Sequence, residues 1–395
     1  MKSIINYKQI FLIIFIILIN QTIFCQSQPA KPEKVYRIIY TQKSNDWYIE
    51  QANLWQMELD KNPKNADAWF NYYKANRYAN FPGGSDQFSQ DKKSRLDKIV
   101  NDMGKQVPNS FEFNYLKFFN SDEKKENLSY LERAYNLQPD SPDTYYELIV
   151  YYLLNGEDKK AYNFLEKLYD TQDIAPGLVN YNYNVLMSTD KNAILFTNGD
   201  NDTYPCWMLQ QAKDVRTDVS VWNIHMLQKS SYLKKLLDEK NLEIDLKELP
   251  DPKSPDFIAE LTKSLHQKYP KIPIYFALTV YAPFTESISD DLYLIGLAYK
   301  YSPTRIDNVA MLKNNWENNF RLDYLNYDWY SENYVATETM RKMLNQNYIA
   351  PAIMLYEHYK TSGETTKAER LKEFALQISK AAGKEKEVMD ALMKK

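Results

Sequence analysis

Carboxylates, amides and aromatic side chains gather in one short segment, NGDNDTYPCW, at positions 198–207. An apolar run at 193–197 precedes it and a helical pattern follows, which is the strand, loop and helix order in which α/β proteins often bind ligands. The candidate ligand-binding residues are those of this segment and of the next strand: Asn198, Asp200, Asn201, Asp202, Thr203, Tyr204, Trp207, Arg216, Asp218 and His225.

A structural interpretation accounts for much of this segment. Asp202 or Thr203 can cap the following helix, and Pro205 suits its first turn, where a missing N–H costs nothing. Gly199 is expected to turn the chain with a positive φ.

The second carboxylate needs another explanation, because capping uses only one. Asp200 therefore either forms an ion pair, with Arg216 as the natural partner, or takes part in binding. Two ligand classes stay open: a glycan, whose hydroxyls suit Asp, Asn, Thr, Tyr and Trp side chains, and a divalent metal held by Asp200 and Asp202. The spacing does not fit an EF-hand, since position 211 is Gln.

The usual catalytic and cofactor motifs are missing from the sequence. The chain has nine glycines, and no two are separated by a single residue, which removes the dinucleotide fingerprint and the phosphate-binding loop. Three histidines lie far apart, at positions 225, 266 and 358, and no Gly-x-Ser-x-Gly elbow occurs. The absence of these motifs from the sequence argues against an enzyme, and we expect no cofactor.

Charge narrows the class of partner. The net charge is −3, with 49 basic and 52 acidic residues, so no basic excess exists to neutralise nucleic-acid phosphates. Lysines and acidic residues alternate along the chain, as on solvated helix faces. The partners we expect are proteins or small molecules, not nucleic acids.

The N-terminus is typical of an export signal. Lys2 and Lys8 precede an apolar block of about ten residues, whereas a membrane-spanning helix needs about twenty. Cleavage near Cys25 or Ser27 predicts a periplasmic or envelope-associated protein. An uncleaved signal is the alternative, and so is a lipid anchor on Cys25, although Phe24 stands where a lipoprotein signal needs a small residue.

Aromatic and aliphatic residues then recur at spacings of three and four, which predicts tetratricopeptide-like helical repeats. The clearest unit places Tyr145 and Tyr152 before Ala161, with a turn at 155–158. Pro63 precedes Trp69 by the same six residues that separate Pro139 from Tyr145. Such helix pairs must stack to bury their apolar faces.

The spacing of apolar residues changes between about residues 191 and 307. Apolar runs of strand length lie at 193–197, 219–224, 274–280 and 292–298, with helical stretches at 205–212, 231–237 and 255–268 between the earlier ones. This alternation predicts a small parallel sheet. Helical patterns return at 338–344, 350–360 and 366–382, where Tyr359 and Ala368 repeat the spacing of Tyr152 and Ala161, and the charged tail from 384 is expected to fray.

Residues 196–210, 215–219, 294–303 and 315–320 resemble the soluble C-terminal region of Bacteroidetes multispan membrane proteins of the protein O-mannosyltransferase-like type. The resemblance covers about residues 191–379 and implies an α/β module of unknown function followed by tetratricopeptide-like helices. The spanning helices that carry the family's presumed transferase chemistry are absent from this chain. The resemblance therefore implies no transferase activity.

These observations predict a mainly α-helical protein in which tetratricopeptide-like repeats flank a small parallel-sheet α/β domain. The expected organisation is a signal peptide at 1–27, a linker at 28–44, helical repeats at 45–188, the α/β domain at 189–310 and a helical C-terminal region at 311–395. The leading functional hypothesis is an exported interaction or scaffold protein of the bacterial cell envelope, with a protein partner held by the repeats. The alternatives are a glycan-binding or glycan-processing accessory module that uses the Asp200–Asp202 loop, and a divalent-metal-dependent hydrolase.

Overall fold

The computed structural model describes residues 30–80, 89–122, 124–327 and 334–393. The predicted signal peptide lies outside the described residues. Contacts divide the chain into two compact units. The first contains residues 43–108 and the chain up to Val35, and the second contains Tyr36–Gln42 and Asn109–Lys395.

The helices of the first unit are α2 (Asn45–Lys61), α3 (Ala66–Tyr78) and α4 (Gln90–Gln106). Each begins at a side-chain cap: Ser44, Asn65 and Ser89 accept hydrogen bonds from the backbone N–H of the third residue that follows. α2 and α3 pack against each other as a helical hairpin, and Trp55 and Tyr73 are buried in it.

The second unit begins with more helical repeats: α5 (Phe111–Phe119), α6 (Lys124–Leu137), α7 (Pro142–Leu154), α8 (Asp158–Thr171) and α9 (Pro176–Met187). The predicted repeat is confirmed in the α7–α8 hairpin, where Tyr145, Tyr152 and Ala161 are all buried. The proline spacing also has a structural counterpart. Tyr145 Oη donates to the Pro139 carbonyl at 2.5 Å, and Trp69 Nε1 donates to the Pro63 carbonyl at 2.8 Å. In both repeats an aromatic side chain thus ties the helix to the turn before it.

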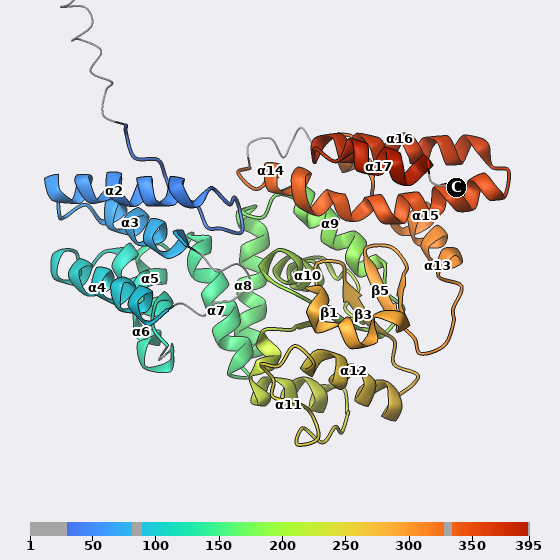
Figure 1. The fold of residues 1–395 in the computed structure, drawn as a ribbon. Coiled ribbons are helices and arrows are strands. Elements are labelled where there is room, and N and C mark those ends of the chain that lie inside the picture. Colours follow the sequence, from blue (N-terminus) through green and yellow to red (C-terminus); the bar gives the residue numbers. More distant parts are fainter. Residues whose placement is uncertain (1–29, 81–88, 123, 328–333, 394–395) are drawn as a thin grey trace, which may run out of the picture. The chain divides into compact units, whose positions relative to one another are not determined.

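The α/β module contains the strands β1 (Ile194–Thr197), β2 (Ser220–Asn223), β3 (Ile274–Ala277), β4 (Leu292–Leu294) and β5 (Ala298–Tyr301). Its helices are α10 (Asp200–Lys213), α11 (Ser230–Glu239) and α12 (Phe257–Lys268). Figure 1 shows β1, β3 and β5 in the middle of this module, between the helices. The strand order is β2-β1-β3-β5-β4. β1 is fully buried, and Phe196 contacts Phe276 of β3 and Trp222 of β2, with ring centroids 5.0 and 5.8 Å apart.

The sheet differs from the predicted parallel sheet in its last two strands. β1 pairs in parallel with β2 and β3, but β5 pairs antiparallel with β3 and with β4. The apolar run at 292–298, expected to be one strand, is instead one arm and the turn of a hairpin around Gly296, whose φ is +147°. Without a helix between β4 and β5, the chain must reverse directly and the pairing is antiparallel.

The C-terminal region contains α13 (Asn308–Asn314), α14 (Thr337–Thr339), α15 (Ile349–Thr361), α16 (Thr365–Ala381) and α17 (Glu385–Met393). The segment predicted as a helix at 338–344 is mostly a π-helical turn, Met340–Leu344. α15 and α16 form the predicted hairpin, with Tyr359 and Ala368 buried against each other's helices.

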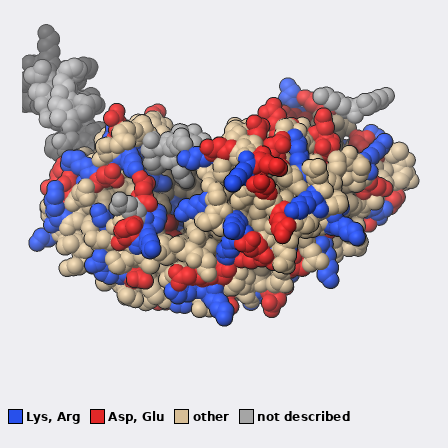
Figure 2. Space-filling view, turned by 90° about the horizontal axis from the view of Figure 1, so that it is seen from below, with Lys and Arg blue, Asp and Glu red and all other residues tan. Residues whose placement is uncertain are grey.

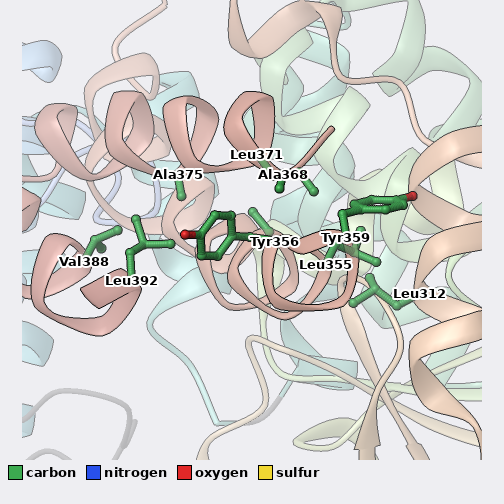
Figure 3. Close-up of a cluster of buried hydrophobic side chains, with 10 residues drawn as sticks. Leu312, Leu355, Tyr356, Tyr359, Ala368, Leu371, Ala375, Val388 and Leu392 are labelled. Carbon is green, nitrogen blue, oxygen red and sulfur yellow. The ribbon is translucent and has the colours of Figure 1, made fainter. Parts of the chain in front are cut away.

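The charged tail does not fray as predicted. Residues Glu385–Met393 form α17, and Val388 and Leu392, four residues apart, belong to a buried cluster with Leu355 and Leu371 (Figure 3). Asp390, which lies between them, and the preceding Glu385, Lys386 and Glu387 are exposed. A two-residue apolar stripe is therefore enough to hold this helix in place.

Charged side chains of both signs are interspersed on the face of the molecule drawn in Figure 2. None of the helices in the described ranges is long and apolar enough to cross a bilayer.

Candidate functional site

The Asp200–Asp202 loop lies at the carboxyl end of β1, and α10 begins at Asp200 itself. Asp202 is buried and closes the turn: its carboxylate accepts hydrogen bonds from the backbone N–H of Asn198 and of Gly199, both at 2.7 Å, and from Thr279 Oγ1. Burial raises the pKa of this carboxyl, and the three hydrogen bonds oppose that shift. Asp202 is held by its own loop and by the end of β3.

Two local expectations for this turn are wrong. Gly199 has φ −149°, an extended conformation open to any residue, because the helix starts at once and no left-handed step is needed. Pro205 lies inside α10 and not in its first turn. Its missing N–H leaves the Asn201 carbonyl without an intrahelical partner, and the buried Asn182 Nδ2 supplies one at 2.8 Å.

Asp200 faces a cation from the N-terminal segment. Arg37 Nη2 lies 3.7 Å from Asp200 Oδ2, and Arg37 Nη1 lies 4.0 Å from Asp143 Oδ1. The guanidinium also stacks over the Tyr146 ring, 4.4 Å from its centroid. Neighbouring acidic and phenolic groups raise the pKa of Arg37 even though burial opposes this, so it stays charged.

The expected Arg216–Asp200 pair does not form. Arg216 binds Asp218 in a bidentate pair, with Nε–Oδ1 and Nη2–Oδ2 distances of 2.9 and 3.0 Å. It also donates to the carbonyls of Leu186, Thr189 and Asp190 at the end of α9. This pair lowers the pKa of Asp218 to about 2. Arg216 thus fastens α9 to the start of β2.

The other candidate residues divide between two environments. Asn201 Nδ2 donates to the Ile39 carbonyl at 3.1 Å and Tyr204 Oη to the Tyr146 carbonyl at 3.1 Å, so both face the same side as Asp200. Thr203 is buried between Thr197 and Asn223. Asn198 Oδ1 is buried and has no hydrogen-bond partner within the described ranges.

Two candidates point elsewhere. Trp207 Nε1 donates to the Val221 carbonyl at 3.3 Å, which places its indole against the edge strand β2. His225 is exposed, and its ring packs edge-on against Phe284, with centroids 6.1 Å apart.

No motif or periodicity in the sequence marks the residues that complete the Asp200 environment. Arg37 and Tyr40 belong to Tyr36–Gln42, inside the range predicted as a linker. Tyr40 and Tyr146 both donate through their hydroxyls to Asp173 Oδ2, the second at 2.7 Å. Only the folded chain brings this segment to the start of α10.

A second feature is a groove across α6, α7 and α8, with a volume of about 640 Å³. Its lining residues are Tyr135, Pro139, Asp140, Pro142, Tyr145, Lys167, Asp170, Thr171 and Asp173.

Aromatic rings form one wall of this groove. Phe164 lies 5.4 Å from Tyr135 and 5.6 Å from Tyr145, measured between ring centroids. Lys167 Nζ donates to Tyr135 Oη at 2.5 Å, so the one ammonium in the lining is engaged by a neighbouring hydroxyl. A shallower hollow lined by Phe164, Lys167 and Asp170 extends the groove along α8.

Comparison with known proteins adds one family match. Residues 178–247 match the family model described as TMEM260-associated domain 2. The matched segment contains β1, the Asp200–Asp202 loop, α10, β2 and α11. It agrees with the predicted resemblance to membrane proteins of the protein O-mannosyltransferase-like type, over this part of the chain.

No curated protein sequence matches the chain. Among solved structures, the chain is similar to the structure described as "Crystal structure of MamA", with 16% identity, a TM-score of 0.26, and coverage of 52% of this chain and 99% of that one. A TM-score of this size carries no argument about function.

Proposed function

We propose that this protein is an exported interaction module of the bacterial cell envelope, in which the helical repeats hold a partner protein and present the α/β module. The groove across α6, α7 and α8 carries the proposal. It offers aromatic and proline surface for an apolar side chain, and Asp140 and Asp170 are exposed at its rim. The lining contains three carboxylates, Asp140, Asp170 and Asp173, and one ammonium, Lys167, so the groove suits a partner segment in which Lys or Arg flanks an apolar residue.

The first test of the proposal identifies the partner protein by cross-linking. A photo-crosslinking amino acid is put at position 167 of the full chain, and the cross-linked envelope protein is identified by mass spectrometry. Its binding to the purified chain is then measured by calorimetry.

Charge reversal in the groove provides the decisive comparison. Asp140→Lys combined with Asp170→Lys should weaken binding of that partner by about tenfold or more, since two attractive charges become repulsive. Asp238→Lys combined with Glu373→Lys makes the same change in net charge on exposed positions of α11 and α16 and should leave binding unchanged. Equal affinities for the two double variants would refute the proposed binding face.

Export is a separate part of the proposal and rests on the N-terminal sequence. Cell fractionation of the native protein should recover it in the envelope or periplasm, with a mature N-terminus near Cys25 or Ser27. Deletion of residues 1–27 should retain it in the cytoplasm. Recovery of the intact N-terminus in the cytoplasm of cells with the native gene would overturn this part.

A glycan-binding role is a second candidate, and two observations at the loop favour it. Asn198 Oδ1 is buried without a partner within the described ranges, and the Asp200 side chain is 41% exposed. The structure also decides which variant can test it. Asp200→Asn should leave the turn intact, whereas Asp202→Asn would replace one of the two oxygens that accept from the loop N–H groups by an NH2 donor. Loss of glycan-array binding in Asp200→Asn, with an unchanged melting temperature, would support this candidate.

The hydrogen bonds of Asp202 argue against the hypothesis of a divalent-metal hydrolase. Both oxygens of Asp202 accept hydrogen bonds from the loop backbone, so sharing a cation with Asp200 would break the start of α10. No group of three or more metal-binding side chains occurs among the residues that the structure describes.

A further inference from the structure

A cavity lies where the helical repeats meet the α/β module, between α7 and α8 on one side and α10, β2 and α11 on the other. Its volume is about 190 Å³. One water needs only about 10–15 Å³, and sites for drug-sized ligands measure about 300–1,000 Å³. The cavity therefore has room for a small molecule of roughly one ring.

Several hydrogen-bonding side chains that line this cavity have no partner within the described ranges. Tyr232 is buried, Ser220 and Gln211 are half-buried, and Thr217 is exposed at the rim. No hydrogen bond joins their side chains to any other residue in the described part of the chain, and the same holds for the buried indole Nε1 of Trp222, a further lining residue. Buried polar groups normally have partners, so the N–H of Trp222 and the hydroxyl of the buried Tyr232 are the two groups that need water or a ligand.

The two charged residues in the lining of this cavity, Lys235 and Glu239, have opposite signs. Lys235 forms an ion pair with Asp158 and lies 3.6 Å from Glu239 at the rim. An anionic or cationic ligand would have to compete with these internal pairs. A neutral ligand would not.

The cavity has an open side and a closed floor. Tyr162, Thr217 and Glu239 are exposed, whereas Leu165, Trp222 and Tyr232 are buried. The walls combine the aromatic side chains of Trp207 and Tyr232 with the hydroxyl and amide groups described above. Apolar ring faces beside neutral donors and acceptors match a polyhydroxylated ring, which presents C–H faces and hydroxyl edges.

We propose that this cavity is a binding site for a neutral, polyhydroxylated molecule about the size of one sugar ring. The site is distinct from the Asp200–Asp202 loop and from the groove across α6, α7 and α8. Its walls from α10, β2 and α11 all fall within residues 178–247, the segment that matches the family model.

Saturation-transfer NMR and calorimetry on the full chain test this site with three neutral probes: methyl α-D-glucopyranoside, methyl α-D-galactopyranoside and myo-inositol. Acetate, inorganic phosphate and cyclohexanol serve as the anionic and the nearly apolar counterparts. At least one polyol should bind with a Kd on the order of 1 mM or tighter.

Three variants locate the binding. Tyr232→Phe removes one hydroxyl with almost no change in volume and should weaken binding about five- to tenfold. Thr217→Trp fills the exposed rim and should abolish it. Thr365→Trp makes the same substitution at an exposed position at the start of α16 and should have no effect.

Several results would overturn the proposal. These are the absence of polyol binding to the folded wild-type chain, polyol binding that survives Thr217→Trp and Tyr232→Phe, or phosphate or acetate binding that Thr217→Trp removes. If Thr217→Trp unfolds the chain, Gln211→Leu replaces it, and unchanged polyol affinity in that variant and in Tyr232→Phe would equally refute the site. The first result would leave a water-filled cavity and no ligand site.

Discussion

Arg37 Nη2 lies 3.7 Å from Asp200 Oδ2. Asp200 is the first residue of α10, and Arg37 precedes all the repeat helices of the second unit in the chain. The contact is an ion pair at longer than hydrogen-bond distance. Arg37 also forms an ion pair with Asp143, and its guanidinium stacks over the Tyr146 ring. It holds Tyr36–Gln42 onto the second unit.

A double-mutant cycle should measure this pair. Arg37→Met should lower the free energy of unfolding by about 1–3 kcal/mol, because two carboxylates and an aromatic face lose their cation. The coupling with Asp200→Asn should be only about 0.5–1 kcal/mol, since the Asp200 side chain is 41% exposed. Urea denaturation gives both values. A cycle with Asp214→Asn, at an exposed position, should show no coupling, and a similar value in both cycles would contradict a direct interaction.

Asp218 should make stability depend on acid pH. Its folded pKa of about 2 lies below the ordinary value of 3.8, so its ionised form favours the native state above that ordinary value. This contribution should disappear as the pH falls from about 4 to about 2. The difference in pKa corresponds to at most about 2.5 kcal/mol, and partial exposure reduces our expectation to about 1 kcal/mol.

Asp218→Asn should remove this part of the acid dependence, as measured by urea denaturation at a series of pH values. Asp214→Asn serves as the control. An unchanged slope in Asp218→Asn below pH 4 would show that the Arg216 pair contributes nothing to stability.

Gly296 should not tolerate a side chain. Its φ of +147° is unfavourable for other residues, and an added Cβ would lie 2.7 Å from both Phe320 Cζ and Ser188 Oγ. Gly296→Ala should therefore cost about 2–4 kcal/mol of unfolding free energy. Gly363 also has a positive φ, +81°, but nothing lies near its Cβ position, so Gly363→Ala should cost only about 1 kcal/mol. Equal losses would mean that backbone conformation alone, without the close approach, accounts for Gly296.

Cys206 should be chemically inert in the folded protein. The thiol is fully buried beside Asn182, and burial raises its pKa, so little thiolate forms at neutral pH. In a Cys25→Ser chain, iodoacetamide should label Cys206 only after denaturation, as followed by peptide mass spectrometry. Labelling of native protein at a rate near that of unfolded protein would show that the helix opens readily.

Local patterns were enough to predict the repeat helices. In the α7–α8 and α15–α16 hairpins, residues nine apart, such as Tyr152 and Ala161, are both buried because helix periodicity and a short turn place them on the packed faces. The apolar runs of β1, β2 and β3 were likewise recognisable, since buried strands consist of consecutive apolar residues. The direction in which β4 and β5 pair was not recognisable, because the apolar run around Gly296 has the same composition whether it forms one strand or a hairpin.

Within the candidate site, the sequence by itself limited the capping residue to Asp202 or Thr203, because a cap acts on backbone groups a few residues away. The structure decides for Asp202, whose carboxylate accepts from Asn198 and Gly199, four and three residues earlier. The partner of Asp200 was decided only by the tertiary structure. Arg216 was the expected partner because it precedes the next strand, but its short-range geometry pairs it with Asp218. Arg37 comes from a segment that no repeat or motif marks in the sequence. Interactions over a few residues follow from chain geometry, whereas a long-range ion pair depends on how whole helices pack.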